Sequence, residues 1–177
     1  MNTHNTPVSK TAIKENLLRL LNKKDLLDIT VRELCHVSGV NRSTFYRHYD
    51  NIIDPLEEIC DDILNRIIET SSSSYKEPQN ALKNVTDSLY FFKEHDEYDS
   101  LFRSGSFALE ILSRKMEQLI ERNSDLKSSP YGTYLAKYLL SGSYKIILDW
   151  VNGGRKESVE ELSAILMRLT SATVKAF

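Results

Sequence analysis

Residues 30–49 of the chain, TVRELCHVSGVNRSTFYRHY, carry the signals for two short helices joined by a tight turn. Thr30 and Glu33 have the spacing of a capping box, in which the hydroxyl and the carboxylate each accept a backbone N–H that the first turn of a helix leaves unpaired. Gly39 can take the left-handed conformation with which many helices end. The stretch therefore predicts a helix, a glycine turn and a second helix.

The second of these helices is unusually polar. Asn41 is a favourable N-cap, and after it only Phe45 and Tyr49, one helical turn apart, form an obvious core pair. The other side chains are mostly hydrogen-bonding groups, which a recognition helix needs for base edges and phosphates. Two helices joined at a glycine also occur in many all-α proteins that bind no DNA, so the pattern alone leaves both interpretations open.

The distribution of charge favours DNA. Residues 1–50 contain eight Lys or Arg against five Asp or Glu, a net charge of +3, whereas the whole chain is −2 and residues 51–177 are therefore −5. A basic N-terminal segment on an acidic remainder is typical of a protein that contacts nucleic acid at one end. Because the segment is only mildly basic, we expect modest non-specific affinity with a strong dependence on salt.

Apolar residues recur at helical spacing through most of the remaining chain. Pro55 is tolerated only in the first turn of a helix, so a long connecting helix is predicted to begin at Ile53 or Asp54. Further helices are predicted over residues 9–24, 81–95, 107–122, 131–152 and from Ser158 onward, with a linker at 71–78, an acidic turn at 95–99 and a polar loop at 123–130. We therefore expect an all-α fold: a three-helix head with a helix-turn-helix (1–52), joined by a long helix to a helical-bundle dimerisation and ligand domain (53–177).

The last two predicted helices are strongly apolar. Ser158 and Glu161 form a second capping box, and the helix that it opens has its apolar residues at heptad spacing. Since so short a chain has little left to cover this pair, we predict a twofold interface with a second copy. The alternative is a core formed within one chain. The residues assigned to the dimer interface are Tyr138, Gly142, Trp150, Leu162, Leu166 and Leu169.

Other classes of protein are disfavoured by composition. No apolar run is long enough to span a membrane, the first ten residues do not form a signal peptide, and 41% hydrophobic content argues for a packed intracellular, cytoplasmic protein. Cys35 and Cys60 are expected to be reduced thiols in a core, with a disulfide as the minority alternative. The four histidines are scattered, and neither a nucleophile elbow nor a phosphate loop occurs, so we expect no enzyme, no cofactor and no metal site.

The order of a first helix, the stretch 30–49, a long connector and a helical body resembles the TetR family of bacterial transcriptional regulators. The resemblance is close over about the first 65 residues, where the capping Thr30, the Gly39-Val40 turn and the run TFYRHY match the family motif. Residues 144–162, YKIILDWVNGGRKESVEEL, resemble the C-terminal region of the subgroup that contains the dihydroxyacetone-kinase operon activator. The resemblance implies a homodimer that binds an inverted-repeat operator in double-stranded DNA and responds to a small-molecule effector, with repression as the default.

The chain departs from the family where a lysine usually begins the fourth helix, because Ile52 occupies that position. A phosphate contact there would have to come from backbone amides at the helix N-terminus, and Asp50 and Asp54 would work against it. We therefore expect weaker DNA binding, or a site recognised more by its shape.

Candidate site residues follow from the motif and the resemblance. Arg42 and Arg47 are each expected to contact guanine or phosphate, and Tyr46 resembles a phosphate-contacting tyrosine of the family, with packing on the first helix as its alternative. His48 is either a phosphate ligand that strengthens binding at low pH or an exposed polar residue. The predicted DNA-binding set is Thr30, Asn41, Arg42, Ser43, Thr44, Tyr46, Arg47 and His48. Aromatic candidates for an effector pocket, which are as readily core residues, are Phe92, Phe102, Phe107, Tyr134 and Tyr138.

One competing hypothesis remains at this level. The protein could be a TetR-like interaction protein or co-regulator that binds another protein and has weak or no DNA binding of its own. The departure at Ile52 and the low charge of the head favour it, while the polar helix from Asn41 to Tyr49 argues against it. The operator sequence, the target genes, the effector and the choice between repression and activation are not encoded in any recognisable motif.

Overall fold

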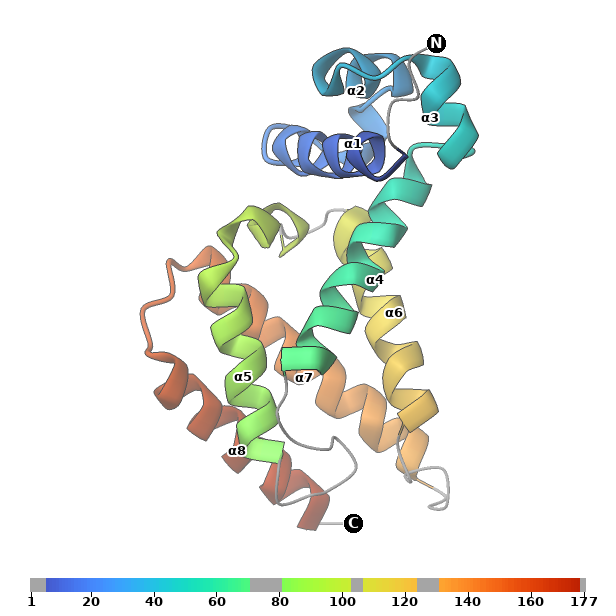
Figure 1. Cartoon of the computed structure of the whole chain (residues 1–177). Helices are drawn as coiled ribbons and strands as arrows, with labels where there is room; N and C mark the ends of the chain where they lie inside the picture. Colours follow the sequence, from blue (N-terminus) through green and yellow to red (C-terminus); the bar gives the residue numbers. More distant parts are fainter. Residues whose placement is uncertain (1–5, 71–80, 103–106, 124–130, 176–177) are drawn as a thin grey trace. The chain divides into compact units, whose positions relative to one another are not determined.

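The computed structural model describes residues 6–70, 81–102, 107–123 and 131–175 of the chain, and the regular elements within these ranges are all helical (Figure 1). The all-α fold predicted from the sequence is thereby confirmed. The predicted linker at 71–78 lies outside the described residues, as does the predicted loop beyond Asn123. The elements are α1 (Thr6–Leu21), η1 (Leu26–Asp28), α2 (Val31–Ser38), α3 (Arg42–His48), α4 (Ile53–Thr70), α5 (Ala81–Glu94), η3 (Asp96–Phe102), α6 (Phe107–Asn123), α7 (Gly132–Asn152) and α8 (Val159–Lys175).

The chain forms two compact units. The head unit comprises residues 1–63 and 97–112, and the body unit comprises residues 64–96 and 113–177. These units do not coincide with a division after residue 52, because the first part of α4, most of η3 and the start of α6 belong to the head unit. The N-terminal helices therefore do not make up the head unit alone.

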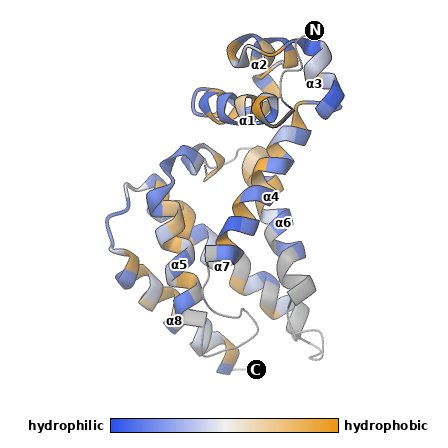
Figure 2. Ribbon diagram, in the orientation of Figure 1, coloured by the Kyte–Doolittle hydropathy of each residue, from blue (hydrophilic) through white to orange (hydrophobic). Residues whose placement is uncertain are grey.

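The head unit is built around the helix-turn-helix. α1 packs against α2 and α2 against α3, with Ile13, Leu34 and Phe45 fully buried among them. α4 carries hydrophobic and hydrophilic residues on different faces (Figure 2), and its Leu56 and Ile63 are also fully buried. The apolar spacing read from the sequence therefore matches the observed core.

One predicted element of the head unit is wrong in kind. The acidic turn expected at residues 95–99 is instead the start of the 3-10 helix η3. Tyr98, Leu101 and Phe102 of this helix are buried. The burial of these apolar side chains is the physical reason for a helix in place of a loop. The acidic residues around them made the segment read as a solvated turn in the sequence.

The body unit is held together by α8, which packs against α5 and α7. The predicted capping box is confirmed, because the Ser158 amide donates to Glu161 Oε2 (2.8 Å) and the Glu161 amide donates to Ser158 Oγ (3.2 Å). Between α7 and α8, the Trp150 indole donates to the carbonyl oxygen of Glu157 (2.9 Å), and Arg155 Nη2 donates to that of Phe92 on α5 (3.1 Å). In the described part of the chain, no helix is long and apolar enough to cross a membrane.

Candidate nucleic-acid interface

The first helix of the helix-turn-helix begins and ends as its sequence requires. Thr30 Oγ accepts a hydrogen bond from the Glu33 amide (3.1 Å) at the start of α2. A hydrogen bond from Lys24, and after it one from the Thr30 amide, lowers the pKa of Glu33, so its carboxylate stays ionised. Gly39 ends the helix in the left-handed region (φ 65°), and the Val40 amide donates to the Cys35 carbonyl oxygen (3.0 Å). The turn therefore depends on the conformation that glycine permits.

The recognition helix α3 begins directly after Asn41. The carbonyl oxygen of Asn41 accepts from the amides of Thr44 (2.9 Å) and Phe45 (3.0 Å), as expected for an N-cap. Its side chain, however, makes no capping hydrogen bond. The position of Asn41 is thus as predicted, but its side chain is not engaged in capping the helix.

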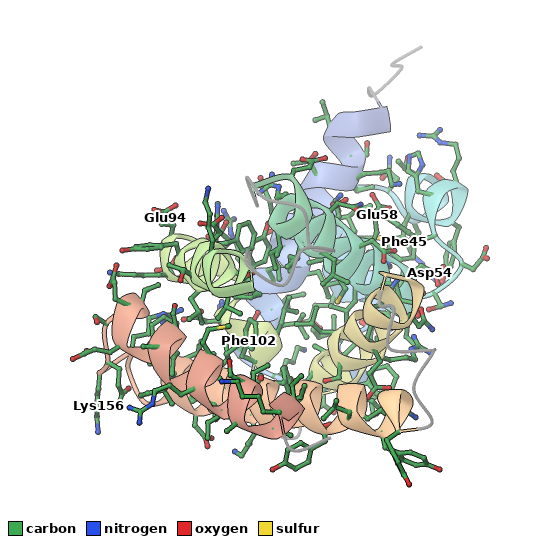
Figure 3. The ribbon with its side chains drawn as sticks, turned by 90° about the horizontal axis from the view of Figure 1, so that it is seen from below. Phe45, Asp54, Glu58, Glu94, Phe102 and Lys156 are labelled. Carbon is green, nitrogen blue, oxygen red and sulfur yellow. The ribbon has the colours of Figure 1, made fainter. Side chains whose placement is uncertain are left out.

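Two residues of this segment anchor it in the head unit. Phe45 and Tyr49 are buried as predicted, with ring centroids 5.5 Å apart. Figure 3 shows Phe45 in the same part of the molecule as Asp54 and Glu58 of α4. The anchor fixes which side of α3 faces outward.

The outward side of α3 carries the predicted contact residues. Arg42, Ser43 and Arg47 are exposed, and Thr44 and His48 are half-buried. Tyr46 is 48% exposed, with the Arg42 guanidinium 5.9 Å from its ring centroid. This stacking holds an arginine and a phenol side by side on the exposed face.

An open depression of about 780 Å³ connects the start of α2 with the start of α3. Arg32 and His36, one helical turn apart on α2, line it together with Arg42. Neither Arg32 nor His36 was among the residues predicted from the sequence. Their four-residue spacing, which places both side chains on the same exposed face of α2, was the sequence signal that could have identified them. The full lining is Thr30, Arg32, Glu33, Cys35, His36, Gly39, Val40, Asn41 and Arg42.

The charge of the head unit differs from the sequence-based picture. The first part of α4 adds five acidic residues, so residues 1–63 carry a net charge of −2, and residues 97–112 add a further −2. Lys10, Lys14 and Lys24 form ion pairs with carboxylates inside the unit. Among the described residues, no ion pair is found for the arginines Arg32, Arg42 and Arg47. Residues 1–50 are basic as counted from the sequence, but the compact head unit as a whole is acidic. The outward positive charge at its helix-turn-helix comes from arginines.

The segment between α3 and α4 donates hydrogen bonds to a carboxylate of the protein itself. The Asp54 carboxylate accepts from the backbone amides of Asp50 (2.6 Å) and Asn51 (3.2 Å) and from the Asn51 side-chain amide (2.9 Å). Asn51 Oδ1 accepts from the Ile53 amide (2.7 Å). Ile52, at the position where the family usually has lysine, is half-buried. The backbone amides of Asp50, Asn51 and Ile53 are thus already hydrogen-bonded within the protein.

The five aromatic residues predicted to line an effector pocket fall in different places. Phe102 and Phe107 belong to the head unit, and Phe102 is buried in η3. Phe92 is buried in the body unit, where Tyr134 and Tyr138 on α7 are 76% and 67% exposed. Within each unit, the buried members have the environment of core residues.

The residues predicted to form a dimer interface divide into two groups. Tyr138, Gly142 and Leu169 are exposed on α7 and α8. Trp150, Leu162 and Leu166 are buried within their own chain, with at most 4% of each exposed. The exposed group is available to a second copy, and the buried group already forms core.

A capped helix, a glycine turn and a polar helix on an aromatic anchor define the helix-turn-helix class of transcriptional regulators. Residues 79–172, more than half of the chain, match the TetR-type family model described as a transcriptional regulator C-terminal region. The chain therefore belongs to the TetR family of transcriptional regulators.

Similar proteins agree with this assignment. The HTH-type transcriptional regulator YxbF of Bacillus subtilis (strain 168) is 24% identical over 174 residues, which cover 92% of this chain and 45% of YxbF. The chain thus spans about half the length of this curated relative. The fold is similar to that of a TetR transcriptional regulator from Streptococcus agalactiae 2603V (22% identity, TM-score 0.70, 93% and 94% of the two chains). It is also similar to that of the dihydroxyacetone kinase operon activator DhaS (19% identity, TM-score 0.53, 96% and 97%), the subgroup that residues 144–162 suggested.

Proposed function

We propose that the protein is a sequence-specific DNA-binding regulator that acts as a homodimer on an inverted-repeat operator. The observation that carries this proposal is the outward side of α3, where Arg42, Tyr46 and Arg47 are exposed on a helix anchored by Phe45 and Tyr49. An exposed row of donors has no role in the core and fits the edges of bases and the phosphates that flank them. Such a role places the protein with bacterial DNA in the cytoplasm.

Each contact in this proposal has an assigned role. Arg42 and Arg47 read guanine or grip phosphate, and Arg32 extends the contact surface from α3 onto α2 through the depression that Arg32 and Arg42 share. His48 and Tyr46 bind phosphate. The proposed DNA-binding set is Thr30, Arg32, Asn41, Arg42, Ser43, Thr44, Tyr46, Arg47 and His48.

Dimerisation is assigned to exposed residues of α7 and α8. Tyr134, Tyr138 and Gly142 follow one another at four-residue spacing on α7, and Tyr131, its N-cap, is also exposed. On α8, Ile165 and Leu169 are exposed one turn apart. Large apolar side chains exposed in a row mark an interaction surface. A twofold dimer would place one α3 in each half of the operator. Repression relieved by a small effector is the regulatory mode that we assign.

The test is selection of bound sequences from a random duplex library with the purified protein at moderate salt. We expect enrichment of an inverted repeat whose half-sites lie about one helical turn, roughly 34 Å, apart. A recovered motif without twofold symmetry would contradict the dimeric mode. Failure to enrich any sequence, at every salt concentration down to about 50 mM, would contradict DNA reading itself.

The second candidate function is that of a co-regulator that binds another protein. The net charge of −2 over residues 1–63 and the closed segment around Asp54 favour it. The same selection separates the two functions, because a co-regulator without DNA reading gives no enriched sequence and no salt-dependent binding to duplex DNA.

A further inference from the structure

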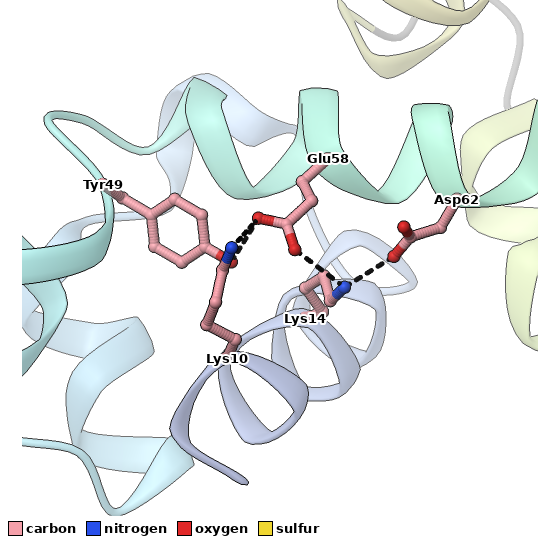
Figure 4. A network of polar contacts seen from close by, with 5 residues as sticks. All are labelled: Lys10, Lys14, Tyr49, Glu58 and Asp62. Carbon is pink, nitrogen blue, oxygen red and sulfur yellow. Dashed lines mark hydrogen bonds and ion pairs between the residues drawn. The ribbon is translucent and has the colours of Figure 1, made fainter. Parts of the chain in front are cut away.

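Three elements of the head unit meet at one carboxylate. Glu58 on α4 accepts from Lys10 (2.6 Å) and Lys14 (3.0 Å) of α1 and from the hydroxyl of Tyr49 (3.0 Å), the residue that ends α3 (Figure 4). Lys14 also contacts Asp62 at 2.5 Å. A single side chain therefore connects α1, the recognition helix and α4.

The cluster is shielded enough to hold its members in place. The side chain of Glu58 is 29% exposed and that of Lys14 is 21% exposed, and Tyr49 is buried. Burial alone would raise the pKa of Glu58, but hydrogen bonds from Lys10, Lys14 and Tyr49 lower it, so the carboxylate is ionised at neutral pH. Burial, and then the charge of Glu58, raises the pKa of Tyr49, so its hydroxyl remains a donor. Hydrogen bonds to ionised groups are stronger than neutral ones.

The bond to Tyr49 acts on the part of the protein that reads DNA. α3 is short, and its core contacts are concentrated in Phe45 and Tyr49. The Tyr49 amide donates to the Phe45 carbonyl oxygen (3.0 Å), so its side chain and the last turn of α3 move together. Arg47 and His48 belong to that turn. The hydroxyl of Tyr49 therefore ties the direction of α3 to α4.

We propose that Glu58 is a positioning residue for DNA recognition, which sets the ratio between specific and non-specific DNA affinity by fixing α3 and by holding Lys10 and Lys14 away from DNA. This inference rests on the proposed function. Glu58 does not contact DNA and acts only through its three partners. It raises specific affinity by orienting α3, because base contacts require a fixed geometry. It lowers non-specific affinity by pairing with Lys10 and, together with Asp62, with Lys14, because that affinity scales with the positive charge available to phosphate.

Two variants separate these effects. Glu58→Gln removes the charge and releases Lys10, while Lys14 keeps its contact with Asp62. Tyr49→Phe removes only the hydrogen bond between Tyr49 and Glu58 and leaves the ion pairs intact. Asp149→Asn is the control, because it breaks the 2.6 Å Lys145–Asp149 ion pair on α7 in the body unit. Affinities for an operator selected as above and for a shuffled duplex are measured by fluorescence anisotropy. Each value is corrected for the active fraction by stoichiometric titration.

We expect Glu58→Gln to lower operator affinity by about tenfold, the size of a lost hydrogen bond to a charged group, and to raise affinity for the shuffled duplex by about twofold to fivefold. Tyr49→Phe should lower operator affinity by a similar factor without changing affinity for the shuffled duplex. Asp149→Asn should change neither. Opposite changes on the two duplexes cannot result from loss of folding, which lowers both.

The outcomes that overturn the inference are distinct from failure of the proposed function. If the parent protein discriminates between the duplexes and both variants keep its ratio, Glu58 has only a structural role and the inference is wrong. Equal losses on both duplexes lead to the same conclusion. If the parent binds neither duplex, the proposed function fails and this inference fails with it.

Discussion

The two ends of the recognition helix are built differently. At its N-terminal end, the side chain of Asn41 makes no capping bond, and Arg42 lines an open depression together with Arg32. At its C-terminal end, Tyr49 is tied to Glu58 and the amides that follow are bonded to Asp54. We call the N-terminal end open, because its cations face outward. We call the C-terminal end closed, because its donors are hydrogen-bonded to the carboxylates of Glu58 and Asp54. A helix of seven residues thus has an N-terminal end with exposed cations and a C-terminal end anchored to α4.

Removal of either exposed arginine of α3 should have the largest effect on operator binding. We expect Arg42→Ala to weaken operator binding by about 1–3 kcal/mol and to relax sequence preference at one base pair of each half-site, if it takes guanine bidentately. Arg47→Ala, near the C-terminal end of α3, should abolish tight operator binding, and neither change should alter the dimeric state. Selection from the random duplex library, repeated with each variant, measures the sequence preference, and sedimentation measures the oligomeric state. Unaltered operator affinity at moderate salt would reject the role of either arginine.

Substitution of Arg32 tests whether the DNA-contacting surface extends from the start of α3 onto α2. We expect Arg32→Ala to reduce operator affinity about fivefold and to reduce the slope of log affinity against log salt by about 0.9 per head, without changing the selected sequence. Arg19→Ala is the matched control, because Arg19 is exposed on α1 and does not line the depression. An equal effect of both substitutions would show that only overall charge matters.

Substitution of Asp54 tests whether its carboxylate keeps the backbone amides of Asp50 and Asn51 from binding DNA phosphate. Asp54→Ala releases the amides of Asp50 and Asn51 and removes a charge, so we expect about threefold tighter DNA binding, together with a loss of stability of about 1 kcal/mol from the lost hydrogen bonds to its carboxylate. Asp50→Asn removes the same charge without releasing those amides. A calorimetric unfolding measurement and a binding titration are made on each variant. Equal gains in affinity for the two variants would show that the released amides of Asp50 and Asn51 do not contribute to DNA binding.

The smallest effect should come from pH at His48. Burial, and then the charges of Arg47 and Lys10, lowers its pKa, with Glu58 acting in the opposite direction. Its ring is therefore neutral in the free protein at pH 7. A DNA phosphate beside the ring would raise this pKa, so binding takes up a proton and operator affinity rises as pH falls below about 6.5.

Folding responds to pH in the opposite sense. A lowered pKa in the folded state destabilises the protein as pH falls through the same range, so affinity must be measured on the folded fraction. Titrations between pH 5.5 and pH 8 compare the parent with His48→Gln. A pH dependence that persists in the variant would show that another group is responsible.

Local signals in the sequence predicted much of the fold and of the candidate site. The capping boxes at Thr30 and Ser158, Gly39 at the turn and the Phe45–Tyr49 pair each depend on residues within one or two helical turns, and the structure has all of them. Such signals are visible because the partners are separated by fixed, short distances along the chain.

Contacts between distant segments escaped prediction. Lys14 lies 44 residues before Glu58, and no local pattern shows that α4 neutralises α1. For the same reason, a count of charges over residues 1–50 suggested a basic head that the compact unit does not have. Heptad spacing in α8 likewise placed Leu162 and Leu166 on a dimer face, although they are buried in their own chain. Periodicity identifies an apolar face but not the surface that covers it.

The internal ion pairs of α1 have a consequence for how the protein would be distributed on a chromosome. A bacterial genome offers millions of non-specific sites, roughly 10⁶ or more, which compete with one operator for every regulator molecule. With Lys10 and Lys14 bound to α4, fewer cations are available to bulk DNA. Under the proposed function, the protein would spend less time on non-specific sequence, so fewer copies per cell would suffice to keep its operator occupied.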